Sequence, residues 1–178
     1  MNDDQDQVVL VDQDDREIGV AEKVAAHREG KLHRAFSVFI FNNQDNLLLQ
    51  KRADDKYHSG GLWSNTCCSH PRPGESTEEA AHRRLMEEMG FDCPLEHILS
   101  FVYHSPVSSE LTEHEYDHVF IGFCGDVTPQ PNPTEVQDWE WVHVDDLQRD
   151  LKQNPDKYSY WLREVLDRVI AAYREKRS

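Results

Sequence analysis

The fold of this chain is indicated most directly by three segments: NTCCSHP at residues 65–71, GE at 74–75 and RRLMEEMG at 83–90. The first segment places a thiol close to an imidazole. The last combines two guanidiniums with two carboxylates, and Arg84 and Glu88 are spaced i, i+4, so they share one face of a helix. Such a face is a place where a metal–phosphate site can be built.

A helix is expected between Ser76 and Gly90. Ser76 and Glu79 form a capping box, and a glycine is the usual residue just beyond a helix C-terminus. One face carries an apolar stripe at i, i+4 and i+8: Ala81, Leu85 and Met89. Another face carries Arg84, Glu87 and Glu88.

Strands are expected around this helix at 8–11, 35–41, 47–51, 99–103, 119–123 and 139–142. Residues 42–46 are turn-forming and make a hairpin of the second and third strands. Asp145 or Asp146 is expected to cap a short helix. After Pro155 a longer helix carries an apolar stripe: Tyr158, Trp161, Leu162, Val165, Leu166, Val169 and Tyr173. Residues 54–74 are expected to form a long functional loop. The result is an α/β protein.

Composition limits the classes of protein. A chain of 178 residues predicts one domain over 1–178, with 1–7 as a flexible acidic tail. A net charge of −15 argues against nucleic acid and against anionic membranes as partners. No apolar run reaches the ~20 residues of a membrane span. The acidic N-terminus is unlike a secretory signal, so the cytoplasm is expected. The four cysteines contain no C-x-x-C pair and are expected to be reduced thiols.

The three segments resemble the Nudix box, G-x5-E-x7-R-E-U-x-E-E-x-G-U, where U is aliphatic. Six positions fit the pattern: Glu75, Arg83, Leu85, Glu87, Glu88 and Gly90. Two depart from it, because Ser69 replaces the first glycine and Arg84 replaces the glutamate that follows arginine in hydrolases.

With these departures, the chain resembles type 1 isopentenyl diphosphate isomerase, a Nudix-fold enzyme that moves a double bond instead of cleaving a phosphate. The N-x-x-C-x-H-P spacing carries the resemblance, together with AAH at 25–27, LHRAFS at 32–37, GLWSN at 61–65, EHE at 113–115 and YSYW at 158–161. It implies a Nudix-type α/β/α sandwich with a mixed sheet.

The resemblance implies two metal sites. One divalent ion, Mn²⁺, Zn²⁺ or Mg²⁺, is expected at His27, His33, His70, Glu113 and Glu115. Mg²⁺ is expected to arrive with the substrate diphosphate and to bind Glu88. A single histidine among ten is more often a surface or packing residue. That reading is kept for His58, His82, His97, His104, His114, His118 and His143.

The resemblance also assigns substrate contacts and chemistry. Four cations are expected to hold an allylic or homoallylic diphosphate: Lys23, Arg52, Lys56 and Arg84. Cys68 and Glu115 would move protons on opposite sides of the substrate, with Tyr103 as a helper. Nearby cations and the charge of the metal are expected to favour the Cys68 thiolate. Trp161 would stabilise a carbocation through its π face, or serve only in core packing. Cys67 has no assigned role.

Two rival functions remain at this point. One is a Nudix hydrolase acting on a nucleoside diphosphate derivative, which Arg84 disfavours because it removes a carboxylate from the box. The other is a non-catalytic metal-binding or regulatory protein. Such a protein would not need a thiol, a metal-side carboxylate and a phosphate-binding cradle all intact, so their joint presence argues against it. The sequence leaves the oligomeric state open.

Overall fold

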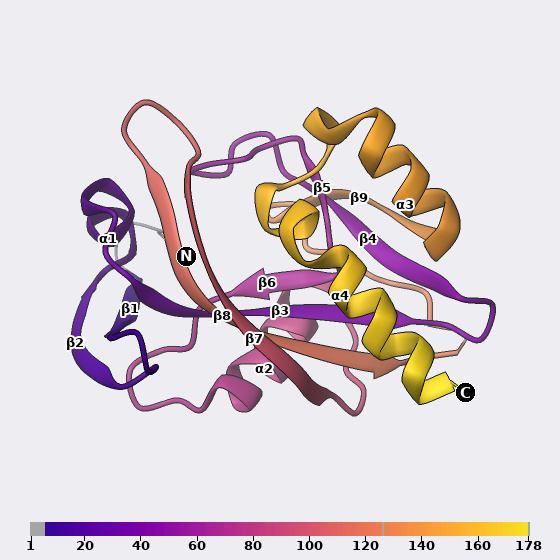
Figure 1. Ribbon diagram of the computed structural model, residues 1–178, viewed down its shortest axis with the longest axis horizontal. Coiled ribbons are helices and arrows are strands. Elements are labelled where there is room, and N and C mark those ends of the chain that lie inside the picture. The colour runs from indigo at the N-terminus through magenta and orange to yellow at the C-terminus, as the bar shows by residue number, and fades with distance from the viewer. Residues whose placement is uncertain (1–5, 126, 178) are drawn as a thin grey trace.

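A single mixed sheet with helices on both faces forms the molecule (Figure 1). The computed structural model describes residues 6–125 and 127–177. The strands are β1 (Gln7–Val11), β2 (Glu17–Glu22), β3 (His33–Phe41), β4 (Asn46–Arg52), β5 (Trp63–Ser64), β6 (Cys67–Ser69), β7 (Glu96–Pro106), β8 (Thr112–Phe123) and β9 (Val136–His143). The helices are α1 (Lys23–Glu29), α2 (Thr77–Met89), α3 (Val144–Gln153), the 3₁₀ turn η2 (Pro155–Lys157) and α4 (Tyr160–Arg177).

Strand β3 is the centre of the sheet. It runs parallel to β8, with His33 opposite Glu115, and antiparallel to β6, with Ser37 opposite Cys68. β8 also pairs with the preceding strand β7, antiparallel to it, and β4 pairs with β9 and β5. This register brings the N-terminal end of β3, the N-terminal half of β8 and the short strand β6 to one place.

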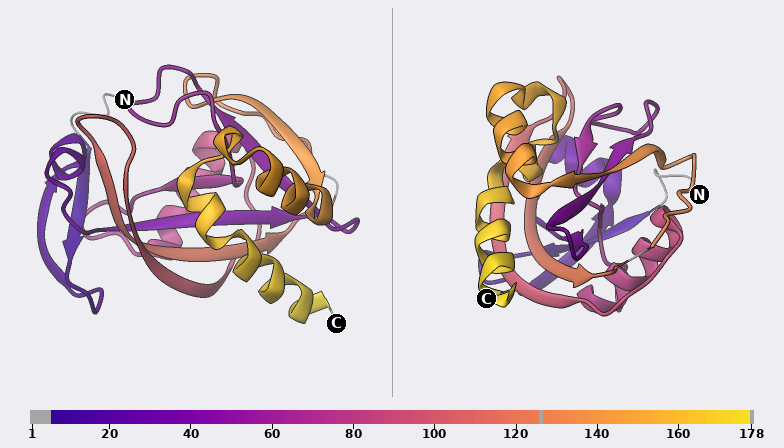
Figure 2. Two further views of the ribbon diagram at one scale, coloured as in Figure 1. Left: turned by 45° about the horizontal axis from the view of Figure 1, so that its top comes forward. Right: turned by 90° about the vertical axis from the view of Figure 1, so that its right-hand side faces the viewer.

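The side chains of β3 alternate between two cores. Phe39 and Phe41 pack with α3 and α4, whereas Val38 and Ile40 pack with α2. Because successive residues of a strand point to opposite faces, one apolar strand can serve both layers. Figure 2 shows α2 on one side of the sheet and α3 with α4 on the other. The predicted α/β/α sandwich is therefore confirmed.

The helix predicted after Ser76 is also confirmed. Ser76 and Glu79 form the reciprocal capping box, and Gly90 ends the helix with φ 76°. The cap predicted for α3 is wrong, because the imidazole of His143 accepts the backbone N–H of Asp145. Asp145 and Asp146 lie in the first turn, where their charges complement the helix dipole.

Several short elements were not expected. Residues 54–74 contain β5 and β6, which hold only two and three residues and depend on partners distant in sequence. β2 and α1 were also missed. The predicted acidic tail, residues 1–7, reaches too far, because Gln7 belongs to β1 and pairs with Glu22 of β2. Residues 1–5 of that tail lie outside the described residues. None of the helices in the described part of the chain has the length and apolar character needed to cross a bilayer.

Candidate active site

A cavity of about 300 Å³ opens where β3, β6 and β8 meet. Its lining contains carboxylates, a thiol, aromatic rings and cations. The lining residues that carry this chemistry are Lys23, Arg52, Lys56, His58, Cys68, His70, Arg84, Tyr103, Glu113, Glu115, Asp117, Glu135 and Trp161.

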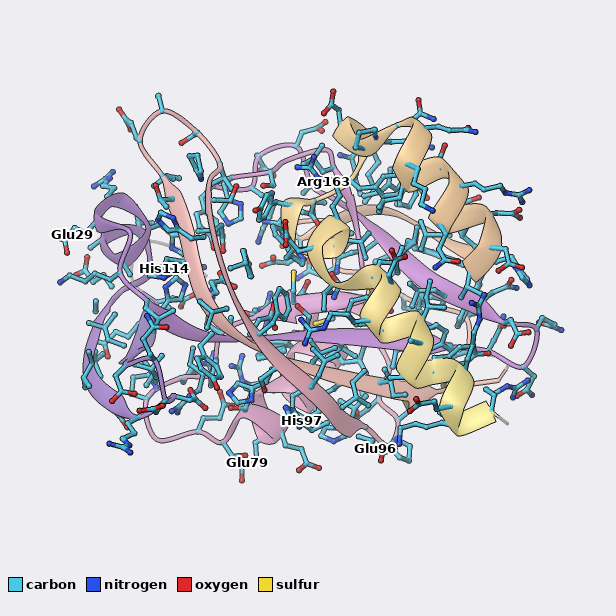
Figure 3. All side chains as sticks on the ribbon, in the orientation of Figure 1. Glu29, Glu79, Glu96, His97, His114 and Arg163 are labelled. Atoms are coloured by element: carbon cyan, nitrogen blue, oxygen red, sulfur yellow. The ribbon has the colours of Figure 1, made fainter. Side chains whose placement is uncertain are left out.

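The carboxylates come from alternate positions of β8. Glu113, Glu115 and Asp117 are all buried and line the cavity. The intervening His114 lies beside α1 (Figure 3), and its Nδ1 is 3.0 Å from the carbonyl oxygen of Gly30. The two-residue period of a strand therefore places both predicted glutamates on the same side, as the sequence suggested.

Three histidines from separate elements meet these glutamates. Nε2 of His27, on α1, lies 3.0 Å from Glu113 Oε1. Nε2 of His70 lies 3.1 Å from Glu115 Oε1, and Nε2 of His33 lies 3.4 Å from the same oxygen. Neighbouring ligands on one ion are about 3 Å apart when the metal–ligand bonds are about 2.1 Å. These spacings are therefore those of donors around a shared cation.

The protonation of the histidines supports that fit. The Nδ1 atoms of His27 and His33 lie 2.7 Å and 2.9 Å from the carbonyl oxygens of Lys23 and Lys31, so each Nδ1–H donates there. The Nε2 lone pairs then face carboxylate oxygens, which also accept. Nε2 of His33 is buried with no hydrogen-bond partner among the described residues. Burial, with the charge of His27, lowers the pKa of His33 to about 4. Neutral imidazoles facing carboxylates suit a divalent cation.

His58 is a member of this cluster that the sequence did not single out. It was expected to be a surface or packing residue: it does not lie on the surface, and it packs against Tyr57 and Trp161, but its place in the cluster was not expected. Its side chain is buried, and Nε2 contacts Glu113 Oε1. His27, His58 and Glu113 form a second group of potential metal ligands beside that of His27, His33, His70 and Glu115. The only signal in the sequence was its position in a long loop expected to be functional.

Cys68 lies on β6 at the edge of the cavity, with Arg52 Nη1 at 3.9 Å from its Sγ. Burial raises the pKa of the Cys68 thiol to about 12, although the charge of Arg52 opposes that shift. Loss of solvation therefore disfavours the expected thiolate, whereas the nearby cation favours it. The thiolate stays a prediction.

The two predicted aromatic residues both line the cavity. The Tyr103 hydroxyl is 2.8 Å from Glu115 Oε2 and 3.0 Å from Glu113 Oε2. Trp161 is 3% exposed, and the Arg52 guanidinium carbon lies 5.2 Å from the centre of its ring. Trp161 therefore lines the cavity and is packed into the protein, so its packing role is confirmed. Its role in stabilising a carbocation stays a prediction.

The four predicted cations all line the cavity. Three of them are paired with carboxylates. Lys23 Nζ is 3.4 Å from Asp6, and Lys56 Nζ is 2.5 Å from Glu135. Arg84 contacts Glu135 as well, with Nη2 at 3.4 Å. An anionic ligand at this end of the cavity therefore competes with the protein's own carboxylates.

The protein matches the family model for the NUDIX domain over residues 31–164. It is 56% identical to isopentenyl-diphosphate Delta-isomerase 1 of Aromatoleum aromaticum over 98% of each chain. The chain belongs to the isopentenyl-diphosphate Delta-isomerase family of NUDIX-domain proteins. A second isomerase of this family, from Photorhabdus laumondii, is 54% identical over 90% of each chain. The crystal structure of DR0079 from Deinococcus radiodurans shares the fold, with a TM-score of 0.77 at 23% identity over 92% of this chain and 98% of that one.

Within the NUDIX box, the two arginines of α2 form ion pairs with glutamates of the same helix and with Glu75, which precedes it. Arg83 makes a two-pronged contact with Glu75, at 2.8 and 2.9 Å. Arg84 Nη1 is 2.8 Å from Glu87 and its Nε is 3.2 Å from Glu88. The residue that departs from the hydrolase pattern therefore neutralises two of the remaining carboxylates.

Glu88, like His27 and His33, is a predicted metal ligand that does not line the cavity. It is 3% exposed and accepts hydrogen bonds from Gln50 Nε2 at 3.1 Å and from Cys67 Sγ at 3.3 Å, in addition to Arg84. Cys67, which had no expected role, is thus a buried donor to Glu88. Burial raises the pKa of Cys67 well above its ordinary value, and the charge of Glu88 adds to the shift.

Proposed function

We propose that this protein interconverts isopentenyl diphosphate and dimethylallyl diphosphate. Its relatives at 56% and 54% identity are named isopentenyl-diphosphate Delta-isomerases and match it over at least 90% of both chains. The observation that carries the proposal is one cavity bordered by Cys68, by Glu115 with Tyr103, by Trp161 and by a cationic end. The product serves reactions that build isoprenoids.

The reaction needs one proton added at C4 and one removed at C2. Cys68 and Glu115 are the proposed pair, one giving a proton and the other receiving one, so the double bond moves from C3–C4 to C2–C3 with no net change in protons. The Tyr103 hydroxyl holds Glu115 in place by a hydrogen bond. A tertiary cation exists between the two steps, and the π face of Trp161 would stabilise its positive charge.

The histidine–glutamate cluster would hold a divalent cation through His27, His33, His70, Glu113 and Glu115. Its chemistry when bound is to polarise the carboxyl group of Glu115 and so to tune that group's acidity. Mn²⁺, Zn²⁺ and Mg²⁺ are the proposed occupants. The N and O donor set suits the first two particularly well.

The diphosphate would bind at the cationic end, to Lys23, Arg52, Lys56 and Arg84. Three carboxylates already contact Arg84 there, so a bare diphosphate would meet repulsion. A second cation, Mg²⁺ carried by the substrate, would offset this charge and bind Glu88 together with phosphate oxygens. The substrate is a small molecule, and no nucleic acid or membrane partner is proposed.

Incubation with isopentenyl diphosphate and Mg²⁺ in D₂O, followed by proton NMR, tests the proposal. The expected result is dimethylallyl diphosphate that carries deuterium. Release of phosphate would instead indicate a hydrolase, and unchanged substrate in a metal-loaded protein would indicate a binding protein. The hydrolase is disfavoured because Arg84 engages Glu87 and Glu88, carboxylates that would otherwise bind metal ions for water activation.

The cytoplasm is the proposed compartment. All four cysteines are free thiols, and a reducing environment keeps them so. Cys68 in particular must stay reduced to exchange a proton.

A further inference from the structure

His58 approaches the metal-binding cluster from the connection between β4 and β5. Its side chain is 3% exposed, and Nε2 contacts Oε1 of Glu113. The same oxygen lies 3.0 Å from Nε2 of His27. Glu113 Oε1 therefore lies between two imidazoles, and the two rings need not have the same role.

The neighbours of each ring distinguish the two roles. Nδ1 of His27 faces the Lys23 carbonyl oxygen, which can only accept, so Nε2 of His27 presents a lone pair. Nδ1 of His58 lies 2.9 Å from the hydroxyl of Ser59, which can donate. A donating Ser59 hydroxyl leaves the proton of His58 on Nε2, where it points at the carboxylate. The opposite tautomer would set two acceptors against each other.

We propose that His58 is a positioning residue of the metal centre: it donates Nε2–H to Glu113 Oε1 and fixes that carboxylate as a ligand without binding the ion itself. This rests on the proposed metal-dependent function. Two groups of potential ligand atoms overlap at His27: one also contains His33, His70 and Glu115, and the other also contains His58 and Glu113. Within the second group, the proton on Nε2 of His58 faces Glu113, so this nitrogen has no lone pair for an ion and His58 acts on it through Glu113.

The surroundings of His58 hold its ring in one orientation. Arg52 Nη2 donates to the His58 carbonyl oxygen at 3.2 Å. The His58 ring meets Trp161 edge-on, with centroids 6.0 Å apart, and meets Tyr57 edge-on at 4.3 Å. His58 therefore links the liganding carboxylate to the aromatic wall and to a substrate-binding arginine. A hydrogen bond to a ligand from such a fixed partner typically changes metal affinity 10–100-fold.

The test measures metal binding in the absence of substrate. The metal-free full chain is titrated with Co²⁺ against a chromophoric chelator, for wild type, His58→Ala, His58→Gln and the control His104→Ala, an exposed histidine on β7. We expect His58→Ala to weaken Co²⁺ binding about 10–100-fold. His58→Gln keeps an N–H donor and should recover most of the loss, and His104→Ala should bind like wild type.

Proton NMR of the Co²⁺-loaded proteins separates positioning from ligation. The set of strongly shifted, exchangeable imidazole N–H signals should be the same in wild type and His58→Ala. Loss of one signal would make His58 a ligand and overturn the proposal, as would Co²⁺ affinity within twofold of wild type in His58→Ala. If His58→Ala does not fold, Ser59→Ala takes its place: it should bind Co²⁺ more weakly than wild type, and an affinity equal to that of wild type would refute the proposal.

Failure of the proposed function gives a different result. A wild-type protein that binds Co²⁺ but does not isomerise isopentenyl diphosphate would refute the proposed isomerase activity. The Co²⁺ affinities of the His58 variants would still decide whether His58 positions Glu113. A wild-type protein that binds no Co²⁺ would refute the metal centre, and the role of His58 with it.

Discussion

The indole Nε1–H of Trp161 donates a 3.0 Å hydrogen bond to the side-chain oxygen of Asn65. Asn65 in turn donates to the carbonyl oxygens of Val38 and Cys67, at 3.1 and 2.8 Å. One amide therefore connects the first turn of α4 to β3 and to the residue before the proposed catalytic thiol. The relative positions of Trp161 and Cys68 depend on this link.

Trp161→Phe is expected to lower turnover more than stability. Phenylalanine keeps a ring but loses the hydrogen bond to Asn65, at a cost of about 1 kcal/mol. A chain of this size should then melt about 2–4 °C lower. A weaker π face should slow turnover tenfold or more, about 1.4 kcal/mol of barrier. Kinetic assays and thermal melts check this, with Trp139→Phe, a tryptophan that does not line the cavity, as control. Wild-type turnover in Trp161→Phe would leave Trp161 a packing residue.

Cys68→Ala is expected to abolish isomerisation while the protein stays folded with its metal. Cys67→Ala should keep much of its activity. It should instead lose about 1–3 kcal/mol of stability, because the buried carboxylate of Glu88 loses a donor. The two variants are compared by product NMR, metal analysis and denaturant unfolding. Equal loss of activity in both would show that the two thiols are not distinct in role.

The five predicted ligands are expected to share one ion. Crystals grown with Mn²⁺ should show one anomalous peak within bonding distance of His27, His33, His70, Glu113 and Glu115. His33→Ala should lower the metal content most clearly without changing the neighbouring backbone, since Nε2 of His33 is buried and has no hydrogen-bond partner among the described residues. Absence of an anomalous peak at these side chains would refute the shared site.

Glu88→Gln is expected to raise the Mg²⁺ concentration needed for half-maximal activity, by about tenfold, which corresponds to about 1.4 kcal/mol. The amide keeps the size of the side chain but weakens its bond to a cation. Glu87→Gln is the matched control, because Glu87 lies beside Glu88 and also contacts Arg84. An equal change in both variants would mean that the effect comes from Arg84 and not from Mg²⁺ at Glu88.

Asp150 is expected to contribute to stability in a pH-dependent way. Hydrogen bonds from Lys157, Tyr158 and Asn154 lower the pKa of Asp150 from 3.8 to about 2. A carboxylate with a depressed folded-state pKa stabilises the protein above about pH 4, and this contribution disappears as the pH falls through the folded-state pKa.

Asp150→Asn should therefore be less stable than wild type at pH 7, by at most about 1 kcal/mol because the pair is accessible to water. The difference should become much smaller near pH 2. Urea unfolding at both pH values measures it, with the exposed Asp156→Asn as control. A difference that is undiminished at pH 2 would show that the charge of Asp150 is not its origin.

Much of the fold followed from local patterns. The box helix has its boundaries at Ser76 and Gly90 because caps are encoded within one turn of the residues they serve. The core strand β3 was found from its apolar run. β5 and β6 were not found, because strands of two and three residues exist only through pairing with β4 and β3, and local periodicity does not record such pairing.

The sequence by itself determined which chemical groups the site contains: the spacing around Cys68, the alternation of Glu113 and Glu115, and the departure at Arg84. The tertiary structure decided their states. It placed His58 against Glu113, and it buried Cys68, which raises the pKa of that thiol despite Arg52. The physical reason is that burial and long-range pairing set hydrogen-bond partners and solvation, and neither is a property of residues that are neighbours in sequence.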